Sequence, residues 1–328
     1  MSAIHYRSFS HLSDDIKRGL GKLQAGHFDL VVGIPRSGMV PAYIIGLYLN
    51  LGVTSLQGLI ANESVKSGST RKARVDPGST HNAQRILLVD DSISSGESLR
   101  KTLDKIPAEL RSRITTLAIY SSKPERSDVD LFLEYIPEPR VFEWNVFHRS
   151  LLGRACVDID GVLCRDPTAA ENDDGERYVE FLLNADPLIL PSYKIHSLVT
   201  NRLSKYRAHT EAWLARHGVE YDNLIMVDLP SAAERQRLGV HSTHKAKYYR
   251  DSGLDFFIES DCKQAREIAK ITQKSVYCVE TTQVYTHSML SGATDSDARL
   301  ALSKTKSRLA ALLPGPARTF VRLLLGRN

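Results

Sequence analysis

Short apolar runs that alternate with helical patterns constrain the fold of this chain more than any other feature. In the first half, apolar runs at residues 28–34 and 85–89 are each followed by a segment with helical periodicity, at 38–51 and 97–106, and residues 114–120 form a third run. The second half repeats this pattern with the apolar runs 155–159, 195–199, 224–227, 256–258 and 275–279. Strands that alternate with helices predict parallel sheets with helices on both faces. We therefore expect an α/β protein with doubly wound parallel sheets.

The length of 328 residues predicts two domains of ordinary size. The expected boundaries are 1–150 for the first domain and 151–295 for the second. Residues 296–328 form a basic tail in which leucines alternate with arginines such as Arg318 and Arg322. A tail of this kind docks on an anionic membrane or packs on its own protein, and the sequence leaves both open, along with the oligomeric state.

Composition narrows the class of protein. The apolar share of 42% and charged share of 25% are those of a globular protein, and the four cysteines lack the spacing of metal ligands. The first residues lack the basic-then-apolar pattern of a signal peptide, and no apolar run approaches the length of a membrane span, so we expect neither. We expect a cytoplasmic enzyme, which the tail would position at the inner face of the membrane if it docks there. The net charge of +5 suits anionic substrates and does not indicate nucleic acid.

The strongest motif of the first half is an apolar strand that runs into two acids and a Ser/Gly loop before a helix. The acids are Asp90 and Asp91, and the loop residues are Ser94, Ser95, Gly96, Glu97 and Ser98. Loop amides and serine hydroxyls bind phosphate at the start of a helix. The two carboxylates accept hydrogen bonds from ribose hydroxyls and hold Mg²⁺ directly or through water. The motif is suited to a ribose 5-phosphate.

This run resembles the PRPP signature of type I phosphoribosyltransferases, in which two acids precede a Thr-Thr-Gly-Gly-Thr-like loop. Glu97 departs from it, since the family more often has Gly there. The resemblance covers roughly residues 25–150. It implies that Arg36 and Ser37, in the Gly-rich turn after the first strand, belong to the pyrophosphate loop. It also implies that Lys66 and Arg71 lie on a mobile catalytic loop between residues 62 and 84.

The most specific motif of the chain is Asp158-Ile159-Asp160-Gly161 at the end of an apolar run. It closely resembles the first motif of the haloacid dehalogenase (HAD) superfamily of phosphatases. The resemblance implies that Asp158 attacks phosphorus to form an aspartyl-phosphate. Asp160 then protonates the leaving alcohol and later activates water.

Three later positions complete the HAD resemblance. Thr200 matches the second motif and is expected to hydrogen-bond a phosphoryl oxygen. Lys245 is our choice for the lysine of the third motif, with Lys247 as the alternative. The fourth motif, which holds Mg²⁺ together with Asp158 and Asp160, falls on Glu259 and Asp261, and the sequence does not decide between them. The roughly 40 residues between Asp158 and Thr200 leave little room for a cap domain.

Together the two motifs predict a bifunctional enzyme. The first domain transfers 5-phosphoribose from PRPP to an acceptor, and the second removes the 5-phosphate from the phosphorylated ribosyl-acceptor intermediate. Paired modules of this kind occur in bacterial surface-polysaccharide assembly, where they install β-ribofuranose, and this is our leading interpretation. The alternatives are nucleobase salvage with a nucleotide phosphatase, and a PRPP-sensing regulator.

Overall fold

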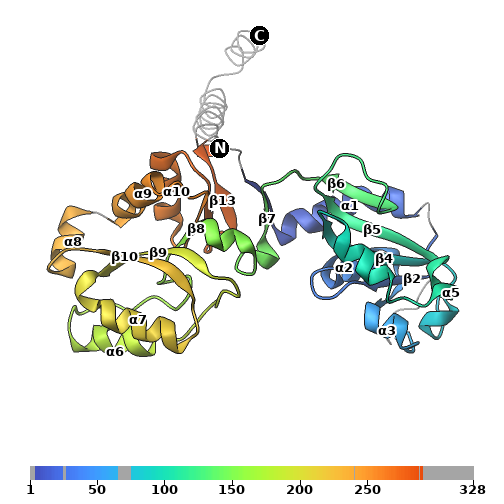
Figure 1. Ribbon diagram of the computed structural model, residues 1–328, viewed down its shortest axis with the longest axis horizontal. Coiled ribbons are helices and arrows are strands. Elements are labelled where there is room, and N and C mark those ends of the chain that lie inside the picture. Colours follow the sequence, from blue (N-terminus) through green and yellow to red (C-terminus); the bar gives the residue numbers. More distant parts are fainter. Residues whose placement is uncertain (1–3, 25–26, 66–74, 240, 288, 291–328) are drawn as a thin grey trace, which may run out of the picture. The chain divides into compact units, whose positions relative to one another are not determined.

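The computed structural model describes residues 4–24, 27–65, 75–239, 241–287 and 289–290. The chain divides into two compact units, the first ending at Val146 and the second beginning at Phe147. Figure 1 shows that each unit is built around its own sheet. No helix in these described ranges is both long and apolar enough to cross a bilayer.

The first unit has a five-stranded parallel sheet in the order β3-β2-β4-β5-β6. Its strands are β2 (Leu30–Gly33), β3 (Gly52–Ser55), β4 (Ile86–Ile93), β5 (Ile114–Ser121) and β6 (Leu131–Tyr135). Its helices are α1 (Phe9–Gln24), α2 (Met39–Leu49), α3 (Leu56–Ile60), α4 (Glu97–Leu103) and α5 (Ala108–Arg111). Two short strands, β1 (His5–Arg7) and β7 (Arg140–Phe142), pair in parallel as a separate sheet.

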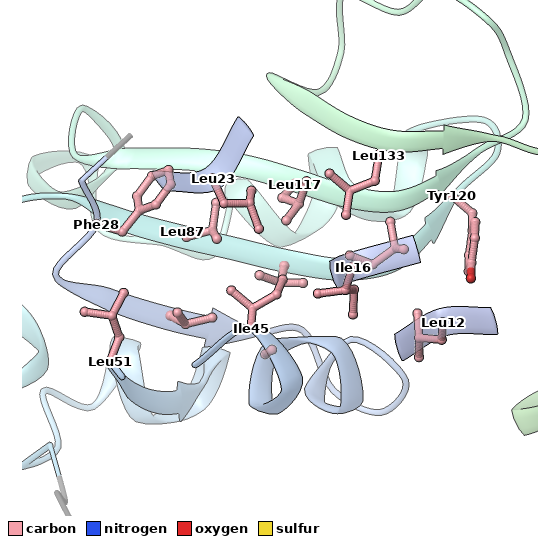
Figure 2. Close-up of a cluster of buried hydrophobic side chains, with 14 of the residues drawn as sticks. Leu12, Ile16, Leu23, Phe28, Ile45, Leu51, Leu87, Leu117, Tyr120 and Leu133 are labelled. Atoms are coloured by element: carbon pink, nitrogen blue, oxygen red, sulfur yellow. The ribbon is translucent and has the colours of Figure 1, made fainter. Parts of the chain in front are cut away.

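Helices cover both faces of this sheet, because alternate strand residues point to opposite sides. Val31 packs with Leu12 and Ile16 of α1 and Ile45 of α2, in the cluster drawn in Figure 2. Its neighbour Val32 packs in a second cluster with residues of α3 to α5. The doubly wound architecture expected for this half is therefore present.

The second unit has a six-stranded sheet in the order β10-β9-β8-β11-β12-β13. Its strands are β8 (Ala155–Val157), β9 (Ile195–Leu203), β10 (Tyr221–Val227), β11 (Phe256–Glu259), β12 (Val276–Cys278) and β13 (Gln283–Tyr285). Its helices are α6 (Glu176–Asn184), α7 (Arg207–Arg216), α8 (Ala232–Leu238), α9 (His241–Asp251) and α10 (Cys262–Thr272). Among the described residues, α6 is the one α-helix between β8 and β9, so this segment holds no separate cap domain.

The sheet of the second unit is parallel as expected, apart from one edge strand. β13 runs antiparallel to β12, while the other five strands are parallel. Only residues 279–282 connect β12 to β13. A parallel crossover requires about a dozen residues or more, so this short connection forces an antiparallel return.

Two strands also extend further than the apolar runs predicted. β4 continues to Ile93, because its pairing with β5 persists through Asp90–Ala118 and Ser92–Tyr120. β9 continues to Leu203, which pairs with Val227. Asp90, Asp91 and Thr200 therefore lie within strands and not at the strand ends where we expected them.

Both strand orders place a reversal of the winding direction inside the sheet. In the first unit this reversal lies between β2 and β4, and in the second it lies between β8 and β11. In open α/β sheets, ligands bind outside the carboxyl ends of the strands at such a reversal. The loop with Arg36 follows β2, and Asp90 and Asp91 lie within β4. In the second unit the acids lie just after β8 and at the end of β11. The topology therefore positions both candidate sites.

Candidate active sites

The first candidate site is formed where the loop after β2 meets β4. Gly38 permits this contact, since a Cβ atom there would lie 2.6 Å from the carbonyl oxygens of Ile34 and Val89 and 3.0 Å from the Cα of Asp90. Any side chain at position 38 would push the loop away from β4. The loop residues Arg36 and Ser37 are exposed and half-buried, respectively. The structure thus brings the expected pyrophosphate loop beside the first acid of the pair.

The acid pair is polar but largely enclosed. The backbone N–H of Asp91 donates to Oδ1 of Asp90 at 2.9 Å. Burial, followed by the negative charge of Asp91, raises the pKa of Asp90 to about 8. Trp144 donates from Nε1 to Oδ2 of Asp91 at 2.7 Å, and its ring stacks on Phe142 with centroids 5.0 Å apart. The aromatic packing at Trp144 therefore fixes the position of Asp91.

Residues that follow β5, Arg126 and Asp128, hold the Ser/Gly loop after β4 in position. Gly96 has a φ of +84°, and a Cβ there would lie 2.0 Å from Oδ2 of Asp128. Asp128 is paired with Arg126, which also donates to the carbonyl oxygen of Ser94 at 2.7 Å. These contacts order the loop without using its hydroxyl groups.

The serines expected to bind phosphate, Ser94, Ser95 and Ser98, are all exposed. Ser95 Oγ accepts a hydrogen bond from the N–H of Glu97 at 3.3 Å. Glu97 itself begins α4 and pairs with Lys101 at 2.7 Å. The charge of Lys101 therefore partly offsets that of the Glu97 carboxylate.

The expected catalytic-loop cations Lys66 and Arg71 lie outside the described residues. The segments flanking residues 66–74 approach each other in an antiparallel bridge between Ser64 and Ser79. Thr80, next to this bridge, is buried and donates from its hydroxyl group to the carbonyl oxygen of Gly58 at 3.3 Å.

The second candidate site begins where β8 ends. The N–H of Asp158 donates to the carbonyl oxygen of Ile258 at 3.0 Å, which keeps Asp158 beside β11. Gly161 then turns the chain with a φ of +72°, and a Cβ there would lie 2.5 Å from the Cβ of Ser260. The first and fourth motifs of the HAD resemblance are therefore adjacent in space.

Lys245 joins these two motifs. Its Nζ lies 2.7 Å from Oδ2 of Asp158, 2.8 Å from Oε2 of Glu259 and 3.2 Å from Oε1 of Gln264. Burial alone would lower the pKa of Lys245, but the carboxylates of Asp158 and Glu259 raise it above the ordinary lysine value. The alternative residue Lys247 is exposed on α9. The structure therefore places Lys245, and not Lys247, in the site.

The environment of Asp158 has opposing effects on its charge. Burial raises the pKa of Asp158, Lys245 opposes this increase, and Glu259 and Asp160 add to it. Oδ1 of Asp158 also accepts from the N–H of Ile159 at 2.8 Å. The carboxylate is thus oriented by one ammonium and one backbone amide.

The second acid of the motif, Asp160, has a different cation. Arg202 of β9 is fully buried and lies 2.6 Å from Oδ1 of Asp160 through Nη2, and its Nε contacts both carboxylate oxygens. Arg202 is held in turn by a bond from Nη1 to the Thr210 hydroxyl at 3.3 Å. The two acids of one motif are thereby held by separate buried cations.

The remaining predicted residues divide between the interior and the surface of the site. Thr200 is fully buried, and its hydroxyl accepts from the N–H of Arg202 at 3.3 Å. Glu259 is 0% exposed, and its oxygens accept from Lys245 and from the N–H groups of Ser260 and Asp261. Asp261 caps α10 by accepting from the N–H of Gln264 at 2.7 Å, and its side chain lines a cavity.

That cavity has a volume of about 560 Å³ and is lined entirely by residues of the second unit. Its lining combines Asp158 and Asp160 with polar groups from α6, α8 and α10. The lining residues are Asp158, Asp160, Gly161, Asp166, Pro167, Asn172, Tyr178, Asn201, Arg235, His241, Ser260, Asp261, Gln264, Val279 and Glu280. A volume of this order accommodates a small organic molecule in addition to a phosphoryl group.

The expected metal ligands of the second unit have other partners in the structure. Within the ranges that the structure describes, no group of three or more His, Cys, Asp or Glu side chains is arranged to hold a metal ion. Asp160 and Glu259 are instead engaged by Arg202 and Lys245.

Sequence reasoning did not identify three residues of these sites. The sequence contained a clue to Arg202, because a charged residue that directly follows Thr200-Asn201 at the end of an apolar run is a candidate site residue. Trp144 lies in an aromatic segment that favours packing over ligand contact, and sequence spacing does not predict its hydrogen bond to Asp91. Arg235 lies in a charged segment, 232–238, that looks like an ordinary solvated helix.

Comparison with known proteins supports the interpretation of the first unit. Residues 10–151 match the family model of the phosphoribosyl transferase domain, so this part of the chain is similar to that family. The match supports PRPP-dependent phosphoribosyl transfer as its activity. It does not extend over the second unit. No curated protein matched the chain.

Three of the solved structures similar to this chain each match less than half of it. The xanthine-guanine-hypoxanthine phosphoribosyltransferase of Helicobacter pylori is 20% identical, with a TM-score of 0.32, and the match covers 43% of this chain and 93% of that one. A purine phosphoribosyltransferase from Pyrococcus horikoshii is 16% identical, with a TM-score of 0.31, covering 44% and 94%. A hypothetical protein from Neisseria gonorrhoeae with bound ppGpp is 12% identical, with a TM-score of 0.30, covering 44% and 91%.

Proposed function

We propose that this chain is a bifunctional enzyme that transfers 5-phosphoribose from PRPP to an acceptor and then hydrolyses the 5-phosphate, leaving a β-ribofuranosyl product. The family match supports the first activity. One observation carries the second, the buried contact of Lys245 with both Asp158 and Glu259 beside a polar cavity. We take the acceptor to be a glycan of bacterial surface-polysaccharide biosynthesis.

In the transfer step, the bond between C1 of the ribose and the pyrophosphate oxygen breaks, and pyrophosphate leaves with the electron pair. Asp90 and Asp91 accept hydrogen bonds from the ribose hydroxyls, and Arg36 neutralises the leaving group. The acceptor oxygen attacks C1 from the opposite face and loses its proton to solvent. Inversion of the α-configured donor gives a β-linked product.

In the hydrolytic step, a carboxylate oxygen of Asp158 attacks phosphorus. The bond to the ribose 5-oxygen breaks, and Asp160 gives that oxygen a proton. Asp160 then takes a proton from water, which attacks the aspartyl-phosphate and releases inorganic phosphate. Lys245 orients the nucleophile and Arg202 holds Asp160, so each acid has a fixed position for its own task.

The donor set of the second cavity is compatible with Mg²⁺. This ion commonly uses one or two carboxylates and completes its coordination with water and phosphate oxygens. Asp158 and Asp261 both line the cavity, whereas Glu259 is buried against Lys245. We therefore propose Asp261, and not Glu259, as the fourth-motif ligand beside Asp158. When bound, Mg²⁺ would neutralise charge on the phosphoryl group.

A single variant separates the two activities. Asp158→Asn should stop phosphate release but retain transfer, so a product heavier than the final one by one phosphate should accumulate with PRPP and a panel of sugar acceptors and nucleobases, detected by mass spectrometry. Asp186→Asn is the matched control, because the Asp186 side chain is 86% exposed. Formation of the final product by Asp158→Asn, or of free ribose as the main wild-type product, would contradict the proposal.

A further inference from the structure

Among the described residues, the buried arginine and lysine side chains form ion pairs with carboxylates, except for Arg235. Arg140, Arg202 and Lys245 are buried, and each forms an ion pair, with Glu138, Asp160, and both Asp158 and Glu259, respectively. Arg235 is also buried, at 7% exposure. Among the described residues, no carboxylate lies within ion-pair distance of its guanidinium group.

The hydrogen bonding of Arg235 is also incomplete. Its Nη1 donates to the carbonyl oxygen of Asn201 at 2.5 Å. Its Nε is buried and has no hydrogen-bond partner in the part of the chain that the structure describes. A guanidinium has five N–H donors, and leaving a buried charge unpaired is costly. Arg235 lines the same cavity as Asp158 and Asp160, so an anion in that cavity would complete its environment.

The neighbouring lysine cannot supply the missing contact to a phosphoryl group. An ammonium group has three N–H donors, and Lys245 directs its hydrogen bonds to Asp158, Glu259 and Gln264. His241 also lines the cavity, but burial, followed by the charges of Arg235 and Lys245, lowers its pKa. Arg235 is therefore the cation of this wall with unused donors.

The position of Arg235 is built into the fold. Asp174 accepts from the N–H of Ala232, the first residue of α8, at 3.1 Å. The same carboxylate accepts from the Tyr206 hydroxyl at 2.9 Å and pairs with Lys205 at 2.9 Å. One acid thus ties the start of α8 to the segment after β9, and this fixes the helix that carries Arg235.

We infer that Arg235 binds the phosphoryl group that is hydrolysed at Asp158, and that it does so in place of Lys245. This inference rests on the phosphatase activity proposed above. Arginine suits the task because its planar fork can donate two parallel hydrogen bonds to phosphate oxygens. The guanidinium would contact the group in the ground state and in the aspartyl-phosphate, so its loss should weaken binding of any phosphomonoester.

The experiment compares Arg235→Gln with Arg237→Gln, a matched control whose side chain is 71% exposed on the same helix. Binding of inorganic phosphate in the presence of Mg²⁺ is measured by calorimetry, and hydrolysis of p-nitrophenyl phosphate is measured in parallel. Arg235→Gln should weaken phosphate binding and lower kcat/KM by roughly 10- to 100-fold, the loss expected for a hydrogen bond between charged groups. Arg237→Gln should match the wild type.

A rescue experiment separates binding from folding. Guanidinium ions at millimolar concentration should restore part of the activity of Arg235→Ala, which they cannot do for a misfolded protein. Unchanged phosphate binding in a folded Arg235→Gln protein would overturn the inference, as would a defect limited to substrates with larger anionic leaving groups. Wild-type protein that binds phosphate through Arg235 but hydrolyses no phosphomonoester would instead refute the proposed phosphatase activity alone.

Discussion

Replacing Lys245 by methionine is the sharpest test of the second site, because methionine keeps the length of the side chain and removes its charge. Asp158 and Glu259 would then share a buried region, 5% and 0% exposed, without their common cation. Removing one partner of a buried ion pair generally destabilises a protein by about 3–5 kcal/mol. We therefore expect a large loss of stability that depends on pH.

The pH dependence follows from proton binding. The variant can relieve the uncompensated negative charge by protonating one of the two carboxylates. For an ordinary glutamate pKa of about 4.3, this protonation costs about 4 kcal/mol at pH 7.5 and about 2 kcal/mol at pH 5.5. The native variant then binds a proton that the unfolded chain has lost, so its stability falls as the pH rises. The destabilisation relative to wild type should accordingly fall by more than half between pH 7.5 and pH 5.5.

The assay is urea unfolding followed by the fluorescence of Trp213, a fully buried residue of the second unit. The measurement uses a Trp144→Phe background, which removes the tryptophan fluorescence of the first unit. Adding Glu259→Gln to Lys245→Met removes the carboxylate that would need the proton, and should recover most of the lost stability at pH 7.5. Equal stability of Lys245→Met and wild type at both pH values would refute this account of the buried charges.

Three further predictions concern the first site. Asp90→Asn with Asp91→Asn should abolish the rise in melting temperature that PRPP and Mg²⁺ produce, whereas the exposed Asp104→Asn should keep it; an equal rise in the double variant would remove these acids from the site. Because the pKa of Asp90 is raised to about 8 and binding needs its carboxylate, PRPP affinity measured by calorimetry should increase from pH 6.5 to pH 8.5, and a flat profile would count against ionisation of Asp90. Trp144→Phe removes the hydrogen bond to Asp91 but keeps the stacking, so KM for PRPP should rise roughly 10- to 100-fold for one lost bond to a charged group; an unchanged KM would assign Trp144 to packing alone.

Local patterns were sufficient to predict much of this molecule. Apolar runs gave the approximate positions of the central strands, and acids at their ends gave Asp90 and Asp158. The choice of Lys245 over Lys247 agrees with the placement of the two side chains, one buried beside Asp158 and the other exposed. In each case the signal lay within a few residues along the chain.

Features that depend on distant pairing could not be predicted in the same way. Arg202 meets Asp160 because β9 pairs with β8 in the register Cys156–Ser197, a relation that one strand alone does not contain. The extension of β4 beyond Asp91 depends on β5 continuing beside it. Arg235 has the sequence surroundings of a solvated residue, and only the packing of α8 makes it a buried one.

The contacts of Asp174 have a consequence for engineering this protein. Asp174 lies outside the reacting groups, yet it holds the first turn of the helix that carries Arg235. Selection for new substrates can therefore act at Asp174 or its partner Lys205 and reshape the far wall of the cavity, while Asp158, Asp160 and their cations stay unchanged. A library randomised at Asp174 and Lys205 should therefore alter which leaving groups the cavity accepts without changing the residues that release phosphate.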